Sequence, residues 1–544
     1  MKNGFRQSMA WLHTWTGLTL GWILFAIFAT GTSAYFKEEI SQWMTPEAQV
    51  KPVSNQQAAL GALNSMQQRA ATAKTWYITL PNERQSTTVA YWNGADGFEN
   101  ATLDPSTGQE VAARDTRGGN FFYRFHFELF GFPVLIGRII VGIAAMLMFI
   151  ALVSGVITHK KIISDFFTFR PKKGQRSWLD FHNVTSVLSL PFFMMITYTG
   201  LVIFFYIYMP WGMMAGYGEQ RDKFFDEVSQ SVSMPEATGK PASMLGFDQL
   251  LARAQPALAG RSISRIEMSA PNDESATLKI TPATRDQLNI YNQPIQVNAI
   301  TGQVTTQDAA QSGMIVAAGT VYGLHIAHVA NWPMRWLLFA SGILGCCMVG
   351  SGMVLWTVKR RMQQLKTNRF HVGHYLVERL NISVIIGLPT AMAGFFLANR
   401  LIDVQIEDRS ALEVKAFFIV WGLLLLHALL RPWAKAWKEQ LMLAGLAFAA
   451  VPIINLIVTP DAALINTLKD GNWVLAGFDL TMLAFAAVFW IMLSYLIRHQ
   501  DKVVAKMQQK IEKRQLAKAL AKQQAELQNT ELQKNELLQA EKEG

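Results

Sequence analysis

The sequence predicts a mainly α-helical polytopic membrane protein of about eight spans, with two outer α+β domains between spans 1 and 2 and between spans 3 and 4. Hydrophobic residues make up 51% of the 544 residues and charged residues only 16%, a balance that is unusual for a soluble enzyme. Several stretches reach the length of about 20 mostly apolar residues that a bilayer requires. One long polar segment lies between the first and second stretches and another between the third and fourth, which predicts folded domains outside the membrane.

The apolar stretches give the expected order of elements. We expect spans near residues 14–36, 134–158, 184–208, 334–357, 380–398, 413–430, 439–458 and 475–497. The first is too long for the apolar region of a signal peptide, so we interpret it as an uncleaved anchor. The divisions that follow are span 1 (1–36), outer domain 1 (37–130), span 2 (131–158), a loop (159–183), span 3 (184–208), outer domain 2 (209–332), span 4 (333–357), a loop (358–379), an additional four-span region (380–497) and a helical tail (498–544).

Basic residues orient these spans, because loops rich in Lys and Arg stay in the cytoplasm. They cluster after spans 2, 4 and 6, at Lys160, Lys161, Arg170, Lys172, Lys173, Arg176, Lys359, Arg360, Arg361, Arg431, Lys435 and Lys438. We therefore expect a multi-pass protein of the bacterial inner membrane, in contact with lipid, with both termini cytoplasmic and the outer domains in the periplasm. The net charge of +10 follows from this topology, and we expect no nucleic-acid partner.

The two outer segments resemble each other. Each opens with helix-like sequence (Ala58–Ala73 and Phe247–Ala257) and continues into alternating, strand-like runs such as Thr75–Leu80 and Ala276–Ile280. Each then reaches a Thr-Gly turn, in LDPSTGQEV (103–111) and in VNAITGQV (297–304). We expect each segment to form a small α+β domain whose final strands make a hairpin.

The first four spans repeat as well, so the first 360 residues or so are two copies of helix, outer domain, helix. The repeated features are Trp-Leu shortly before a histidine (His13, His182), a later Thr-Gly (Thr30-Gly31, Thr199-Gly200), Tyr-x-(Phe/Leu)-His (Tyr123 to His126, Tyr322 to His325) and Ser-Gly (Ser154-Gly155, Ser351-Gly352). Internal repeats of membrane proteins commonly place a shared site between the copies.

The repeated histidines predict two haem sites. His13 and His182 lie at the cytoplasmic ends of spans 1 and 3, while His126 and His325 lie at the outer ends of spans 2 and 4. A b-type haem needs two neutral histidines on opposite sides of its ring. Zinc would need three or four ligands, and neither level offers acidic or thiolate companions. We therefore expect two haems b, with their iron bound by His13 and His182 and by His126 and His325.

Other polar residues leave alternatives open. His159 ends span 2 on the cytoplasmic side and is an alternative axial ligand, although its repeat equivalent is about Trp356; His328 is a similar alternative to His325. We interpret His371 and His374 as part of a polar loop, with a metal or electron-entry site as the alternative. Arg138 and Arg335 fall inside the outer halves of spans 2 and 4, where they would contact haem propionates or reach the headgroups.

The remaining chain is less informative. Spans 5 to 8 contain His427 and Asp479 as notable polar residues, and the tail predicts a long cytoplasmic helix, either solvated alone or in a coiled coil. Because both repeats end before residue 365, we expect the preceding residues to hold both haems without these later spans.

These motifs resemble the PepSY-associated transmembrane family: the WLH opening, DPSTGQ and NAITGQ, LDFHNV, and the Ser-Gly span endings followed by basic pairs, over residues 1 to about 365. Within it the chain is similar to iron-regulated proteins grouped with the ferrisiderophore reductase. The resemblance implies periplasmic PepSY-like domains, haem, and an oxidoreductase that delivers electrons to a periplasmic ferric siderophore or ferric chelate. Spans 5 to 8 extend beyond the four-span core of that reductase.

The electron donor is expected to be a quinol or a cytoplasmic protein, because the sequence has neither a P-loop nor a G-x-G-x-x-G at a strand-to-helix turn. Two other classes of function remain as alternatives. The outer domains could be binding or protease-regulating modules on a non-redox anchor, or the repeats could line the path of a transporter. A red purified protein would distinguish the haem protein from both.

Overall fold

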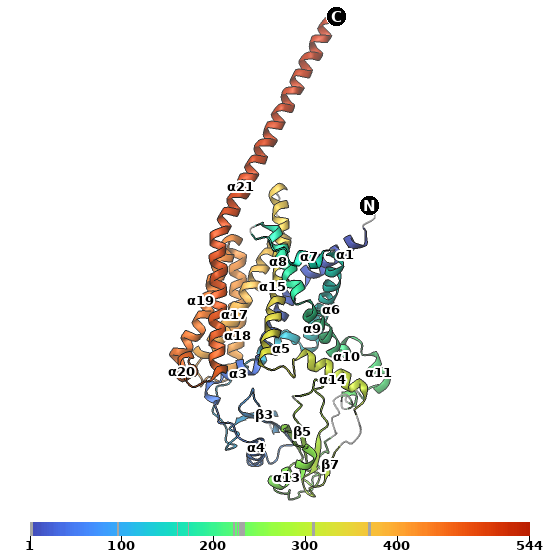
Figure 1. Ribbon diagram of the computed structural model, residues 1–544, viewed down its shortest axis with the longest axis vertical. Helices are drawn as coiled ribbons and strands as arrows, with labels where there is room; N and C mark the ends of the chain where they lie inside the picture. The colour runs from blue at the N-terminus through green and yellow to red at the C-terminus, as the bar shows by residue number, and fades with distance from the viewer. Residues whose placement is uncertain are drawn as a thin grey trace.

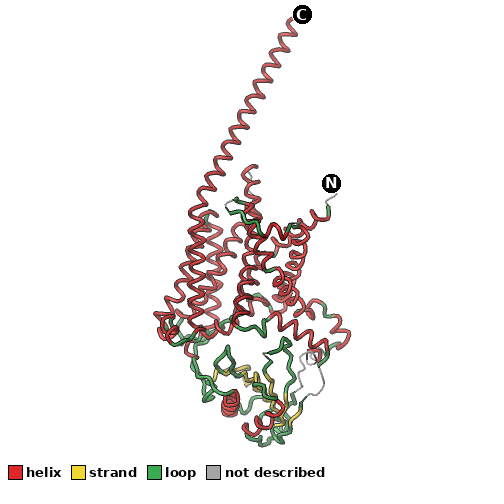
Figure 2. The backbone as a smooth tube through the Cα atoms, in the orientation of Figure 1, coloured by secondary structure: helices red, strands yellow, loops and turns green. Residues whose placement is uncertain are grey.

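The computed structural model describes residues 4–94, 97–159, 161–171, 173–220, 223–225, 227, 234–284, 286–306, 311–367 and 371–543, so Lys160 and Lys172 lie outside the described residues. A bundle of helices forms the middle of the molecule, a β-sheet with its own helices lies at one end, and a long helix projects from the other (Figure 1). Figure 2 shows the strands, in yellow, gathered at the sheet end. Both termini lie on the side of the bundle away from the sheet.

The bundle is a polytopic membrane domain. Among the described residues, six helical segments are long and apolar enough to cross a bilayer, and the number rises to eight if each of two bent helix pairs is one span. The segments are α6 (Val134–Thr158), α15 (Trp332–Thr367), α16 to α17 (Val372–Leu401), α18 (Arg409–Leu430), α19 (Trp433–Val458) and the start of α21 (Trp473–Glu543). The bent pairs are α1 (Phe5–Thr19) with α2 (Gly21–Ala34) and α8 (Gln175–Leu188) with α9 (Leu190–Ile203).

Spans 1 and 3 bend at corresponding places. The first bends by 65° and the second by 66°. The breaks fall at Leu20, seven residues after His13, and at Ser189, seven residues after His182. Both break residues leave the helical conformation, with ψ angles of 7° and 20°. The duplication inferred from the sequence therefore extends to the backbone.

Seven strands of the described chain form one antiparallel sheet in the order β3-β2-β1-β4-β5-β6-β7. The first outer segment supplies β1 (Thr75–Thr79), β2 (Thr88–Gly94) and β3 (Gly97–Leu103); the second supplies β4 (Ile263–Ser269), β5 (Thr277–Pro282), β6 (Ile295–Asn298) and β7 (Val304–Thr305). We expected two separate small domains, but β1 pairs with β4 and joins the segments. This pairing covers two strand edges that separate domains would expose, and it shares one hydrophobic core between two small halves.

Each outer segment contributes one helix to the common core. The helices are α4 (Asn55–Arg69) and α13 (Phe247–Leu258), close to the expected positions. They pack with alternate strand residues, among them Trp76, Ile266 and Leu278, in a single cluster of buried side chains. Period-2 burial of this kind is what the alternating sequence predicted.

The two Thr-Gly turns have the same backbone geometry. Gly108 and Gly302 adopt φ angles of +70° and +74°, which glycine tolerates without strain. Asp104 and Asn298 occupy the same position before these glycines, and each side-chain oxygen accepts a backbone hydrogen bond two residues on, at 2.7 Å and 3.0 Å.

Short helices connect the bundle with the sheet. They include α3 (Lys37–Met44), α5 (Asn120–Glu128), α10 (Phe205–Tyr208), α11 (Trp211–Tyr217), α14 (Gly313–His325) and α20 (Leu464–Lys469), with single turns at Pro46–Ala48 and Pro460–Ala462. On the opposite side α7 (Ile162–Phe166) precedes α8. The helices α5 and α14 immediately precede α6 and α15, so each lies at the sheet end of a span.

Candidate functional site

Two pairs of histidines face each other in the described part of the chain. His13 on α1 and His182 on α8 have ring centroids 6.2 Å apart and ring planes at 68°. His126 on α5 and His325 on α14 have centroids 6.1 Å apart and planes at 33°. Each pair therefore combines one histidine from each repeat, as the duplication predicted. The second pair lies at the sheet end of the bundle.

The spacing within each pair suits two imidazoles bound to one iron. Metal–imidazole bonds are about 2 Å long. Two such bonds in line, together with the radii of both rings, place the ring centroids about 6 Å apart. The distances of 6.2 Å and 6.1 Å agree with this arrangement.

The Nδ1 atom of each histidine is held by the chain. It lies 2.8 Å from the Ala151 carbonyl oxygen for His13 and 2.9 Å from that of Met348 for His182. For the outer pair, His126 Nδ1 lies 2.8 Å from the Ile27 carbonyl oxygen, and His325 Nδ1 lies 2.9 Å from Thr199 Oγ1 and also bonds to the backbone of Ile196. A carbonyl acceptor favours the proton on Nδ1, which leaves the Nε2 lone pair available to a metal.

Glycines make room for the rings. A Cβ atom on Gly155 would lie 3.0 Å from His13 Cε1, and one on Gly352 would lie 3.2 Å from His182 Cε1. The corresponding distances are 2.5 Å from Gly31 to His126 Nδ1 and 3.0 Å from Gly200 to His325 Cε1. The repeated Thr-Gly and Ser-Gly motifs thus mark the places where an imidazole packs on a helix backbone. The sequence revealed the motifs, but not which histidine each glycine accommodates.

The alternative histidines have other polar partners. His159 Nε2 lies 2.8 Å from the amide nitrogen of Asn183, next to His182. His328 Nε2 lies 3.1 Å from the Thr284 carbonyl oxygen. The geometry therefore favours His13 with His182, and His126 with His325, over pairs that include these two residues.

The HxxH histidines point to different surroundings. His371 is exposed at the N-terminus of α16, whereas His374 is buried, stacks on Trp356 at 6.2 Å and lies 3.1 Å from the Thr357 carbonyl oxygen. Within the residues that the structure describes, no group of three or more His, Cys, Asp or Glu side chains could hold a metal ion. A haem differs from a bare metal ion here, because its ring supplies the equatorial ligands and the protein supplies only the axial pair.

The two arginines of the outer level pair with carboxylates. Arg138 Nη2 donates to Glu128 Oε1 at 2.8 Å, and Arg335 Nη1 donates to Glu39 Oε1 at 3.0 Å. Glu39 also accepts from Arg84, which belongs to the outer segment. These partners could not be predicted from the sequence, because Glu39 and Glu128 lie on the short helices α3 and α5 outside the spans. Arg138 and Arg335 both line the cavity beside the outer histidines.

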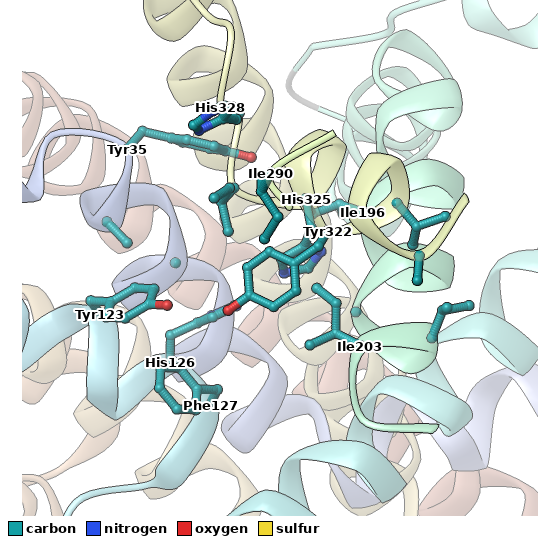
Figure 3. A pocket seen from close by; sticks show the side chains of 18 of the residues that line it. Tyr35, Tyr123, His126, Phe127, Ile196, Ile203, Ile290, Tyr322, His325 and His328 are labelled. Carbon is teal, nitrogen blue, oxygen red and sulfur yellow. The ribbon is translucent and has the colours of Figure 1, made fainter. Parts of the chain in front are cut away.

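A cavity of about 1890 Å³ extends from the outer histidine pair to the sheet. Its lining includes His126 and His325, helix residues such as Ile196, the end of β1 with the loop that follows it (79–84), and the start of β4 (262–265). Figure 3 shows Tyr123 and Tyr322, the tyrosines of the repeated Tyr-x-(Phe/Leu)-His motif, pointing toward one another beside the histidines, and their side chains hydrogen-bond. The outer pair is thus accessible from the side of the sheet.

The fold and this geometry define a duplicated, polytopic membrane protein with paired histidines and an α+β domain at one end of the helix bundle. The chain belongs to the family of the PepSY-associated TM region, whose model matches residues 10–359. The match ends before the last four candidate spans. No curated protein matches the chain.

Proposed function

We propose that this chain binds two b-type haems, one between His13 and His182 and one between His126 and His325, and conducts electrons across the membrane. The observation that carries this proposal is the geometry of the two pairs, with centroids 6.2 Å and 6.1 Å apart and every Nδ1 atom held by the chain. Bound haem would supply one-electron redox chemistry. The histidines would provide the axial nitrogens, and the carbonyl acceptors would fix the tautomer and orientation of each ring.

The outer cavity supports an acceptor on the side of the sheet. We propose that the acceptor is a ferric siderophore or ferric chelate in the periplasm, and that the protein is an oxidoreductase of the ferric-chelate reductase type used in iron acquisition. Hard oxygen ligands hold ferrous iron less tightly than ferric iron, so reduction would favour release of the metal. The loop after β1 and the start of β4, which contribute Arg84 and Arg265 to the lining, would contact the complex.

The proposed direction of transfer is outward from the cytoplasm of the bacterium. Both termini lie on the side of the bundle away from the sheet, and the basic loops predict that this side is cytoplasmic. A quinol or a cytoplasmic electron-transfer protein would then supply the electrons at the level of His13 and His182.

A haem assay of the purified full-length protein tests the proposal. We expect two haems per chain and a reduced-minus-oxidised spectrum of bis-histidine b haem. His182→Ala should remove one haem, whereas His499→Ala, a half-buried histidine on α21 whose Nδ1 lies 2.9 Å from the Tyr495 carbonyl oxygen, should remove none. A colourless, folded protein would refute the proposal and favour a binding module or a transporter. Two haems in His182→Ala would assign the inner ligand to another residue, with His159 the first to test.

A further inference from the structure

The helix that carries His126 is held from behind by aromatic residues of the later spans. We define the C-terminal spans as Val372–Leu401, Arg409–Leu430, Trp433–Val458 and Trp473–His499. On α5, buried phenylalanines adjoin the face that carries His126. Their ring centroids lie 4.9 Å (Phe121–Phe395), 5.1 Å (Phe121–Phe417), 5.6 Å (Phe122–Phe396) and 6.0 Å (Phe125–Phe417) from rings of α17 (Leu388–Leu401) and α18.

The segment that leads into α5 is tied to the same spans by polar contacts. Thr116 Oγ1 donates to Glu413 Oε2 at 2.5 Å, and the backbone N–H of Ser410 donates to Asp115 Oδ2 at 3.1 Å. Arg409 donates to the Asp115 carbonyl oxygen at 3.0 Å. Glu413 and Arg409 are fully buried and paired with each other. Charges inside a membrane protein are costly unless they are paired and hydrogen-bonded, so the contacts from Thr116 and Asp115 add to the hydrogen bonding of this buried pair.

The helix α3 is anchored to the C-terminal spans as well. Trp43 is fully buried, stacks on Phe478 at 4.3 Å and donates from Nε1 to Asp479 at 2.9 Å. The guanidinium carbon of Arg400 lies over the Trp43 ring, 3.7 Å from its centroid. The α3 helix in turn accepts a hydrogen bond at Ser41 Oγ from the N–H of Gly119, the residue before α5.

The second repeat is different at the corresponding positions. Counting from Tyr322, the equivalent of Tyr123, the residues that replace Phe121, Phe122 and Phe125 are Thr320, Val321 and Leu324. The helix α14 packs closely on an outer loop instead, because a Cβ atom on Gly323 would lie 1.8 Å from the Leu288 carbonyl oxygen. The C-terminal spans also touch α15 of the second repeat, for example where Phe339 lies 6.4 Å from Phe485, but the described aromatic contacts to a histidine-bearing helix are those of α5.

We infer that the C-terminal spans are a clamp on α5 that positions His126, with Phe395, whose ring lies 4.9 Å from Phe121 and 5.3 Å from Phe122, as a positioning residue. The clamp acts on one histidine of the outer pair, and His325 is positioned separately by α9 and the outer loop. This inference assigns a role to the part of the chain that follows the PepSY-associated region. Its consequence for haem rests on the proposed function, but the packing itself does not.

Hydrogen–deuterium exchange of the full-length protein tests the clamp without reference to haem. In Phe395→Ala we expect the amides of residues 120–128 to exchange at least about tenfold faster, because the loss of a buried aromatic contact promotes local opening. Residues 313–325 should be unchanged. The matched control is Phe489→Ala, which removes a buried ring that stacks on Phe448 at 5.4 Å within the C-terminal spans. It should leave exchange in α5 as in the wild type.

Unchanged exchange of α5 in Phe395→Ala would overturn the inference, and so would an equal acceleration in Phe489→Ala. If Phe395→Ala does not fold, Thr116→Val replaces it. This substitution keeps the side-chain shape, removes the hydrogen bond to Glu413 and the one that Thr116 Oγ1 accepts from the Gly118 N–H, and should also accelerate exchange in α5 selectively.

Carbon monoxide binding to the reduced protein tests the effect on His126. A haem with two axial histidines has no open position, so the wild type and Phe489→Ala should bind no carbon monoxide. In Phe395→Ala about half of the haem should bind it, because one of two sites has a displaced ligand. Haem-containing Phe395→Ala that excludes carbon monoxide would overturn the positioning of His126. A wild type without haem would instead refute the proposed function, and the exchange experiment would still decide whether the clamp exists.

Discussion

Replacing Gly31 by alanine should weaken haem binding at the proposed outer site more than the equivalent change at any other ring-packing glycine. The new Cβ atom would lie 2.5 Å from His126 Nδ1, compared with 3.0 Å at Gly200, 3.0 Å at Gly155 and 3.2 Å at Gly352. Contacts below 3.0 Å require a shift, and both the Gly31 helix and the His126 ring are confined by packing. Overpacking of this kind typically costs about 1–3 kcal/mol, equivalent to about 5- to 150-fold weaker haem binding.

The assay is the rate of haem transfer from each purified variant to excess apomyoglobin, with the two sites resolved as separate kinetic phases. We expect one phase to accelerate in Gly31→Ala and the other in Gly155→Ala. Gly17→Ala is the control, because this glycine lies on α1 near His13 and a Cβ atom there would have nothing within 4 Å. Equal effects of Gly17→Ala and Gly31→Ala, or unchanged haem transfer from Gly31→Ala, would refute the role assigned to the glycines.

Three further predictions concern the electron path, the later spans and the sheet. A His126→Ala, His325→Ala double variant should lose reduction of an added periplasmic ferric chelate yet keep an inner haem that is reducible from the cytoplasmic face; chelate reduction that persists after loss of one haem would remove the outer pair from the path. A chain that ends after residue 365 should keep the haem of His13 and His182 and lose the outer one, because it lacks the rings that cover α5; two haems in the truncated protein, measured by haem content, would contradict this. Hydrogen bonds from Ser106 hold the pKa of Asp104 below its usual value. The ionised Asp104 therefore stabilises the sheet domain at pH values above the usual pKa of an aspartate, and this stabilisation is lost as the pH falls through the lower pKa of the folded state. Asp104→Asn, which copies Asn298, should therefore show a smaller fall in melting temperature between pH 5 and pH 3 than the wild type, and an equal fall would show that Asp104 does not contribute.

Much of the architecture could be predicted because the duplicated sequence repeats the same physical requirements. The apolar stretches predicted a polytopic helical protein, and alternating strands and Thr-Gly turns predicted the α+β character of the outer segments. Pairing of His13 with His182 followed from their equal distances to the Thr-Gly motifs, and the structure brings these residues together.

Other features depended on contacts between distant segments. The pairing of β1 with β4 joins residues about 190 positions apart, for example Ile78 and Ile266, and local sequence contains no signal for it. The carboxylates that pair with Arg138 and Arg335 were missed for the same reason. From the sequence we expected residues 1 to about 365 to hold both haems without the later spans. Because Phe121 packs on Phe395, we now expect those residues alone to hold the proposed inner haem but not the outer one.

The duplication also explains why the candidate sites lie where they do. Corresponding residues of two copies meet where the copies adjoin, and in this chain that happens at His13 with His182, at His126 with His325 and at β1 with β4. The cavity lies between the last two of these meeting places, so it is lined by both repeats. A ligand in the cavity would therefore contact both halves of the sheet while it approaches the outer histidines.

Because the same arrangement would follow from any duplication, the positions where the two copies differ show which features are particular to one copy. The phenylalanines of α5 contact the C-terminal spans, and the corresponding positions of α14 carry no aromatic residue. For this reason we infer that the C-terminal spans position His126 rather than His325.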